Sequence, residues 1–222
     1  MTAVVLHEVA GRQRLGLKGA AAPEFLRARG LVVPERVNHW TEVDGLLVAR
    51  LGMTEFLLEA QTLTPGPSPA DAGEGSKPTH ARISGRGWRE APGEGKEPAA
   101  LGPASPEARL AALAAALATQ VAEATPDLYP VLRADCALEL SGPRANELLL
   151  QSCNVNFAPL ARAATAIAGP LALTQMVGVS VTVLPQRGGD DAIRYRIWCD
   201  PSFGPYLVST LQDIATDINA EG

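Results

Sequence analysis

Residues Leu15–Leu26 read LGLKGAAAPEFL, and residues Leu138–Leu149 repeat this stretch as LELSGPRANELL at a constant offset of 123 positions. Six of the twelve aligned positions are identical. Each copy begins with the alternating apolar residues of a strand, continues through a glycine, and ends with apolar residues at helical spacing. A repeated strand–glycine–helix unit predicts two similar halves, each of which closes its own sheet.

The first half is predicted to contain a small antiparallel sheet. Residues 37–43 and 46–51 alternate as strands around Asp44-Gly45, a dipeptide that is typical of a tight hairpin turn. A further short strand is expected at 55–59. Residues 1–61 are therefore expected to form the first α+β half.

Residues 62–104 differ from the rest of the chain in composition. They hold seven of the 18 prolines and eight of the 21 glycines, and they show no apolar period. Such a segment cannot bury enough apolar surface to offset the entropy lost on ordering. It is predicted to be a disordered insertion, with a mobile lid or a docking linker as the alternative.

The second half, residues 105–222, is predicted to be a helix followed by another α+β unit. Ser105-Pro106-Glu107 provides an N-cap, a proline at the first helical position and an acidic first turn. Residues 192–199 alternate as a half-buried strand, and Asp200-Pro-Ser202 precedes the last helix. The fold class expected for the whole chain is α+β, with a mostly antiparallel sheet and packed helices in each half.

Charge and composition limit the classes of partner. The net charge of −5 and the pI near 5.3 disfavour nucleic acid and anionic membrane surfaces. No apolar run is long enough to span a bilayer, and the first residues lack the pattern of a signal peptide. The three cysteines, which are odd in number and widely spaced, fit reduced thiols better than a disulfide framework. A cytoplasmic protein that binds neither nucleic acid nor membrane is expected.

Common catalytic and cofactor motifs are missing from the sequence. There is no Walker loop, no G-x-S-x-G and no H-E-x-x-H. Of the three histidines, His7 lies in the N-terminal tail and His80 in the insertion, which leaves His39 in a predicted strand. A partly exposed strand residue is the favoured interpretation of His39. We expect no catalytic residue and no metal site, and the sequence identifies no cofactor-binding residue.

Arginines and tryptophans in strand positions are the candidate interface residues. Arg50, Arg194 and Arg196 alternate with apolar neighbours, which predicts a solvated sheet face or, as the alternative, a face that binds anions or a partner. Trp40 and Trp198 would place indole rings on or near that face. Because Trp and Arg are frequent interface hot spots, Trp40, Arg50 and Trp198 are the candidate anchors, with core packing of the two tryptophans as an equal alternative.

Four segments resemble one known family. They are LGLKGA at 15–20 with its helix, NHW at 38–40 followed by LVARLGMTEFLL at 47–58, LSGP at 140–143 with LLL at 148–150 and Cys153, and DPSF at 200–203 with YL at 206–207. The run from Ala49 to Leu58 nearly completes a string usual in that family. In these segments the chain resembles the gamma subunit of heterotetrameric sarcosine oxidase, and it departs from the usual family pattern at Asn156 and Pro201.

The resemblance implies a fold related to the folate-binding aminomethyltransferases and an accessory, non-catalytic role. FAD, FMN, NAD and tetrahydrofolate would lie on the larger flavoprotein subunits, where sarcosine is oxidatively demethylated, and this chain would bind no cofactor. The alternatives are a stand-alone folate-binding aminomethyltransferase-like protein and an interaction module without a ligand. A folate enzyme would need a buried carboxylate, for which Glu55, Asp135 and Glu139 are the acidic residues in strand patterns near apolar runs.

Overall fold

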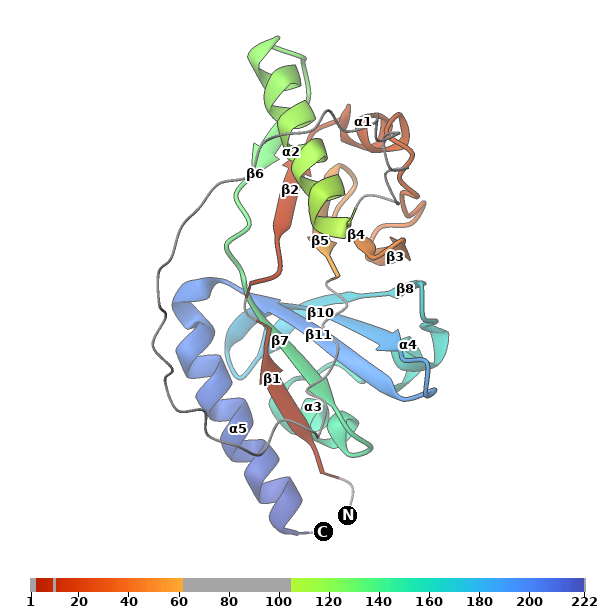
Figure 1. Ribbon diagram of the computed structural model, residues 1–222. Coiled ribbons are helices and arrows are strands. Elements are labelled where there is room, and N and C mark those ends of the chain that lie inside the picture. Colours follow the sequence, from red (N-terminus) through yellow and green to blue (C-terminus); the bar gives the residue numbers. More distant parts are fainter. Residues whose placement is uncertain (1–2, 10, 62–104, 222) are drawn as a thin grey trace, which may run out of the picture. The chain divides into compact units, whose positions relative to one another are not determined.

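The computed structural model describes residues 3–9, 11–61 and 105–221. In this part of the chain, two antiparallel sheets are covered by helices (Figure 1). These residues belong to one unit. The predicted α+β class with mostly antiparallel sheets is confirmed. The predicted insertion at 62–104 lies outside the described residues.

The first sheet has the strand order β6-β2-β5-β4-β3-β8. Its strands are β2 (Arg14–Lys18), β3 (His39–Val43), β4 (Leu46–Arg50), β5 (Glu55–Ala60), β6 (Tyr129–Val131) and β8 (Ala168–Pro170). The second sheet has the order β1-β7-β11-β10-β9. Its strands are β1 (Val5–Glu8), β7 (Cys136–Ser141), β9 (Ala172–Met176), β10 (Val179–Arg187) and β11 (Ile193–Cys199).

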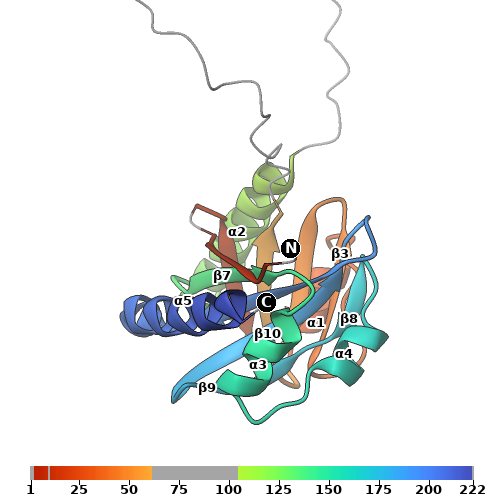
Figure 2. The same cartoon turned by 90° about the horizontal axis from the view of Figure 1, so that it is seen from below.

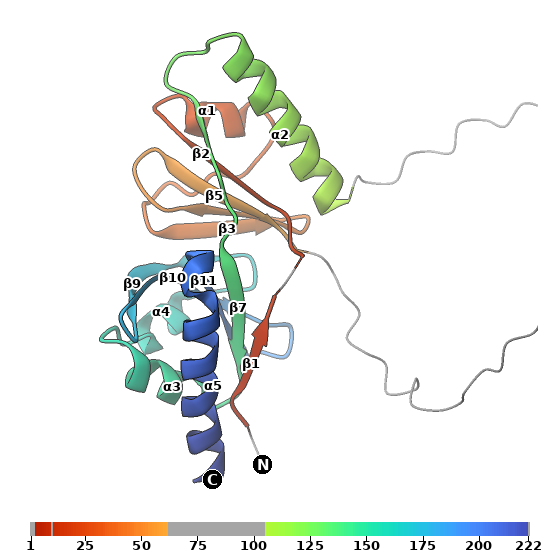
Figure 3. The same cartoon turned by 90° about the vertical axis from the view of Figure 1, so that its left-hand side faces the viewer.

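The helices cover the outer faces of the two sheets (Figures 2 and 3). They are α1 (Ala22–Arg27), α2 (Pro106–Ala122), α3 (Ala145–Ser152), α4 (Ala158–Ala163) and α5 (Gly204–Ala220), with a short 3-10 helix η1 (Pro201–Phe203) before α5. One apolar core joins α1 and α2 to the first sheet, and another joins α3, α4 and α5 to the second. A third core lies between the sheets and is centred on Trp40, Leu57 and Trp198.

The repeat in the sequence corresponds to a repeat in the topology. The order β2–α1–β3–β4–β5–α2 matches β7–α3–β9–β10–β11–α5, with α4 and β8 as additions to the second copy. The matching strands also have the same order across their sheets, β2-β5-β4-β3 and β7-β11-β10-β9. Each copy is therefore one strand–glycine–helix unit completed by three antiparallel strands and a closing helix.

The two copies exchange their edge strands. β1 precedes the first copy in sequence but pairs with β7, and β6 precedes the second copy but pairs with β2. The division between residues 1–61 and 105–222 therefore does not separate the sheets, which corrects the predicted domain boundaries. His7 is likewise part of β1, opposite Glu139, and not in a tail. The chain passes from the first sheet to the second between β6 and β7, at residues 132–135.

Gly19 and Gly142 hold equivalent positions in the two copies. Both have a positive φ, of 123° and 104°. A Cβ at Gly19 would collide with the carbonyl oxygen of Asp127, two residues before β6, and a Cβ at Gly142 would collide with that of Ala3, two residues before β1. Each glycine thus allows the exchanged edge strand to begin directly against the strand-to-helix turn.

Other local signals are also confirmed. Asp44 and Gly45 both adopt positive φ in the β3–β4 turn, as a type I′ hairpin requires. Ser105 accepts a hydrogen bond from the Ala108 N–H and caps α2. The buried residues of α2 are Leu110, Leu113 and Leu117, whereas Val121 near its end is exposed.

Candidate functional site

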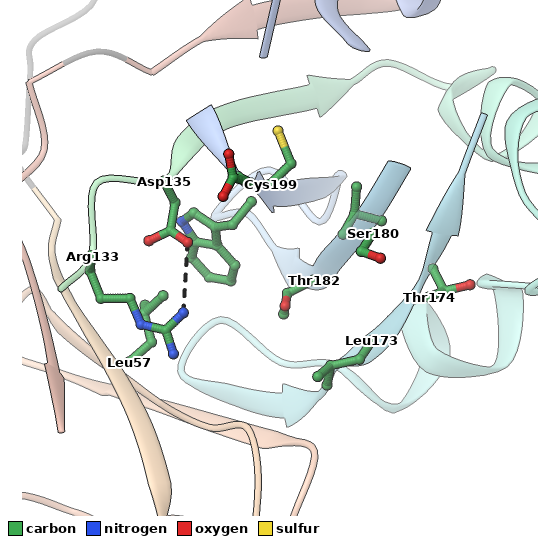
Figure 4. A pocket seen from close by; sticks show the side chains of 11 residues that line it. Leu57, Arg133, Asp135, Leu173, Thr174, Ser180, Thr182 and Cys199 are labelled. Carbon is green, nitrogen blue, oxygen red and sulfur yellow. Dashed lines mark ion pairs between the residues drawn. The ribbon is translucent and has the colours of Figure 1, made fainter. Parts of the chain in front are cut away.

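A cavity of about 400 Å³ lies where the two sheets face one another (Figure 4). Leu57 reaches it from β5, while Leu173, Thr182 and Trp198 come from three strands of the second sheet. The segment that links β6 to β7 supplies Arg133 and Asp135 on one side, as Figure 4 shows. The other lining residues are Thr174, Ser180, Val181, Cys199 and Asp200.

Arg133 and Asp135 carry polar atoms that have no protein partner. Arg133 Nη2 donates to Glu55 Oε1 at 2.8 Å, and its Nη1 lies 3.7 Å from Asp135 Oδ1. Within the described residues, Arg133 Nε and Asp135 Oδ2 are buried and make no hydrogen bond. Because buried polar atoms in folded proteins are nearly always paired, these two atoms are an unsatisfied donor and an unsatisfied acceptor on residues that line the cavity.

A cluster of charged side chains lies beside the cavity, and Trp198 belongs to both. The Glu59 cluster, as we call it, consists of Arg12, Arg14, Glu59, Gln61, Glu139, Arg196 and Trp198. Glu59 on β5 is fully buried. Arg14 Nε donates to its Oε2 at 2.7 Å, and Trp198 Nε1 donates to the same oxygen at 2.8 Å. Arg196 Nη1 pairs with Glu59 Oε1.

The Glu59 cluster joins the two sheets. Arg196 on β11 contacts Glu59 of the first sheet and also donates from Nη2 to Glu139 Oε2 on β7, at 3.2 Å. Burial by itself would raise the pKa of Glu59, but Arg196 and Arg14, with the hydrogen bonds from Arg14 and Trp198, hold this pKa below its ordinary value. Burial lowers the pKa of Arg196, yet a guanidinium stays protonated at neutral pH. The pair is therefore ionised in the folded protein.

The predicted interface anchors do not lie on an exposed face of a sheet. Trp40 and Trp198 are 0% and 2% exposed and pack in the core between the sheets. The core-packing alternative is therefore the correct one for both indoles as the chain stands. Arg50 is half-buried, and its guanidinium donates to the carbonyl oxygens of Pro34, Glu35, Gly52 and Met53. Arg50 thus joins the segments on either side of β4 through four hydrogen bonds to backbone carbonyl groups.

The expected arginine row on a solvated face also requires correction. Arg194 is exposed, but Arg196 is buried because both faces of β11 are covered, one by the helices and one by the first sheet. The alternation of Ile193, Tyr195 and Ile197 in the sequence does not indicate that the first sheet covers the opposite face of β11. His39 is partly exposed on β3, as expected, with its Nδ1 3.1 Å from the carbonyl oxygen of Val37.

Of the three carboxylates considered for a pterin, two share one partner in the link between the sheets and the third belongs to the Glu59 cluster. Glu55 and Asp135 pair with Arg133, and Glu139 pairs with Arg196. Sequence reasoning missed Glu59, the most buried acid of the group, and the two cavity residues Arg133 and Thr182. The signal for Glu59 was weak, because a glutamate near the end of a short strand usually points into solvent.

Within the described residues, no group of three or more His, Cys, Asp or Glu side chains is arranged to hold a metal ion. The helices of that same part of the chain are too short or too polar to cross a membrane. The residues that line the cavity offer two carboxylates, a guanidinium, hydroxyl groups, a thiol and an indole. No protein-family model matches this chain, and the curated proteins contain no significant match to it.

Proposed function

We propose that this chain is an accessory, non-catalytic subunit of the gamma type in a sarcosine-oxidase-like complex of the cytoplasm. The chemistry, with FAD, FMN, NAD and tetrahydrofolate, would belong to the larger flavoprotein subunits. Support comes from the position of the motifs that carry the resemblance. The two strand–glycine–helix stretches occupy equivalent places in the two sheets, and the string at 49–58 builds the β4–β5 hairpin.

The observation that favours a partner is an exposed pair of aromatic rings in one of those motifs. In the run from Asp200 to Leu207, Leu207 is buried, whereas Phe203 and Tyr206 are 52% and 54% exposed. The Tyr206 hydroxyl donates to the carbonyl oxygen of Val177, in the turn between β9 and β10. Because exposed aromatic rings are enriched at protein interfaces, Phe203 and Tyr206 replace the buried tryptophans as the proposed anchors.

A binding experiment with the flavoprotein subunits of a heterotetrameric sarcosine oxidase tests this proposal. The full chain should be retained by the immobilised subunits. Phe203→Ala and Tyr206→Ala should each weaken binding by about thirtyfold, the equivalent of about 2 kcal/mol for an interface hot spot. Leu150→Ala is the matched control, since Leu150 is equally exposed but lies on α3. No retention of the unmodified chain would contradict the proposal.

A folate-binding role is the second candidate, and the polar residues that line the cavity favour it. A pterin ring carries amino and ring N–H donors for the Asp135 carboxylate and acceptors for the Arg133 guanidinium, and Trp198 lines the same space. Calorimetric titration with tetrahydrofolate should then show binding that Asp135→Asn weakens. Asp213→Asn, an exposed change on α5, is the control and should have no effect. Binding that both variants retain equally would exclude this cavity as the site.

A further inference from the structure

Cys136 and Cys199 lie opposite one another although 63 positions separate them in the sequence. Cys136 begins β7, Cys199 ends β11, and the antiparallel register pairs the two residues. Paired residues of antiparallel strands have Cα atoms about 4.5–5.5 Å apart, which falls within the range of roughly 4.4–6.8 Å seen for disulfides. Both thiols are free.

We propose that Cys136 and Cys199 form a site of reversible oxidative modification, at which a low-molecular-weight disulfide converts the two thiols into one intramolecular disulfide. The proposal rests on the register of β7 and β11 and is independent of the function proposed above.

The surroundings of Cys136 provide access and space. Cys136 is partly exposed and lines a cavity of about 610 Å³ together with Pro201, Gly204 and Val208. A Cβ at Gly204 would lie 3.0 Å from Cys136 Sγ, so the absence of a side chain there leaves room beside the sulfur. Cys199 is buried. An incoming reagent therefore reaches Cys136 first.

The reaction proceeds in two exchange steps. The Cys136 thiolate attacks one sulfur of the small disulfide RSSR, which forms a Cys136–SR bond, breaks the RS–SR bond and releases RS⁻. The Cys199 thiolate then attacks Cys136 Sγ, which forms the Cys136–Cys199 bond and releases the second RS⁻. The two cysteines lose two electrons, RSSR gains them, and the two protons of the cysteine thiols end on the released thiols.

The charges around the pair set the rate. Burial, and then the carboxylate of Glu8, raise the pKa of Cys136, whereas Cys199 and Arg14 act in the opposite direction. Burial together with Cys136, Asp200 and Asp135 raises the pKa of Cys199 to about 12. Because the thiolate is the reactive form, the exchange is slow near neutral pH and accelerates as the pH rises.

Cys153 provides an internal control. It follows α3, is buried, and its Sγ lies 3.1 Å from the carbonyl oxygen of Leu149 in the preceding turn. Its partner across the sheet is Met176, so no cysteine faces it in the register.

The test is to treat the native full chain with oxidised glutathione in a mildly alkaline buffer, quench with acid, alkylate, and analyse by mass spectrometry. The expected result is a fall from three free thiols to one, a mass lower by two hydrogens, and a single cross-linked peptide pair that contains Cys136 and Cys199. Dithiothreitol should restore all three thiols.

Three variants assign the roles. Cys199→Ser should retain one glutathionyl group on Cys136, Cys136→Ser should remain unmodified at Cys199, and Cys153→Ser should form the disulfide as the unmodified chain does. The proposal is overturned if the native chain keeps three thiols after prolonged exposure, if the cross-link includes Cys153, or if glutathione stays attached to Cys136 when Cys199 is present.

Discussion

Glu59 is the residue whose buried charge joins the two sheets. Its carboxylate is fully buried and bonded to Arg14 of its own sheet and to Arg196 and Trp198 of the other. A buried ion pair of this kind contributes little by comparison with apolar packing, but removal of one partner leaves the other charge buried without compensation. The cost of losing Glu59 is therefore set by the two guanidinium groups that would remain.

Glu59→Gln tests this argument while it preserves the shape of the side chain. We expect the free energy of unfolding to fall by about 3 kcal/mol, because Arg14 loses its carboxylate partner and Arg196 keeps only Glu139. Urea denaturation, monitored by circular dichroism, measures this change in the free energy of unfolding. Glu24→Gln is the control: Glu24 forms only an exposed pair with Arg27, so its loss should change stability by less than about 0.5 kcal/mol. Equal effects of the two changes would show that the Glu59 cluster is not a buried charge network.

The pH dependence of stability follows from the lowered pKa of Glu59. At neutral pH the residue is ionised in both states and its full contribution is present. As the pH falls below 4.5, the unfolded chain takes up a proton before the folded chain does, so the contribution is lost progressively down to the folded-state pKa. The difference in melting temperature between the unmodified chain and Glu59→Gln should therefore shrink from about pH 7 to about pH 3. A difference that grows on acidification would contradict the assignment.

The residues of the candidate site were only partly predictable from the sequence. Asp135 and Glu139 could be singled out because they lie among apolar strand residues. Glu59 and Arg196 could not be paired, because 137 positions separate them and the contact depends on how the two sheets stack. Local alternation assigns a residue to one face of a strand, but it does not tell whether that face meets water or a second sheet.

At the scale of elements, the strand–glycine–helix turn is the unit on which both halves are built. Gly19 and Gly142 each meet the backbone two residues before an exchanged edge strand. Their role is thus to admit a neighbouring chain segment as well as to adopt a positive φ. A glycine that needs only the positive φ is available for comparison, since Gly30, which follows α1, has a φ of 75° and no neighbouring atom within 4 Å of a Cβ.

Alanine substitutions separate the cost of the positive φ from the cost of the close approach to a neighbouring segment. Gly30→Ala should cost about 1 kcal/mol of stability from backbone strain alone. Gly19→Ala and Gly142→Ala should cost about 1–3 kcal/mol more, because the added methyl group must displace the carbonyl of Asp127 or Ala3. Thermal unfolding of the three variants provides the measurement. If all three melted alike, the close approach of the edge strands would not contribute to stability.

Turns and helix caps could be predicted because they depend on neighbouring residues in the sequence. Edge strands could not, because they are defined by the strand with which they pair. The hairpin at Asp44-Gly45 and the cap at Ser105 depend on neighbouring residues and were found where expected. β6 has three residues, one of them Pro130, and β1 has four, so neither shows a useful period. Which sheet each of them joins is decided by pairing across the chain, and only the structure reveals the exchange.

For the whole molecule, the exchange makes the two sequence halves dependent on each other. The sheet built around β2 takes β6 and β8 from beyond residue 105, and its apolar core includes Leu110, Leu113 and Leu117 of α2. The sheet built around β7 takes β1 from the first half. Neither half has a complete sheet by itself, although each contains the four matching strands of its own copy of the repeat.

Two separate fragments, 1–61 and 105–222, should therefore fold only together. Alone, fragment 105–222 leaves the edge of β7 unpaired, and fragment 1–61 has no α2 to cover its apolar face. We expect no cooperative thermal transition from either fragment and a single transition, with elution as an equimolar complex, from the mixture. Glu59→Gln in the shorter fragment should weaken association by about a hundredfold, the equivalent of about 3 kcal/mol, whereas Glu24→Gln should leave it unchanged. If fragment 105–222 alone melted cooperatively at the temperature of the mixture, the halves would be independent and the exchanged strands would be dispensable.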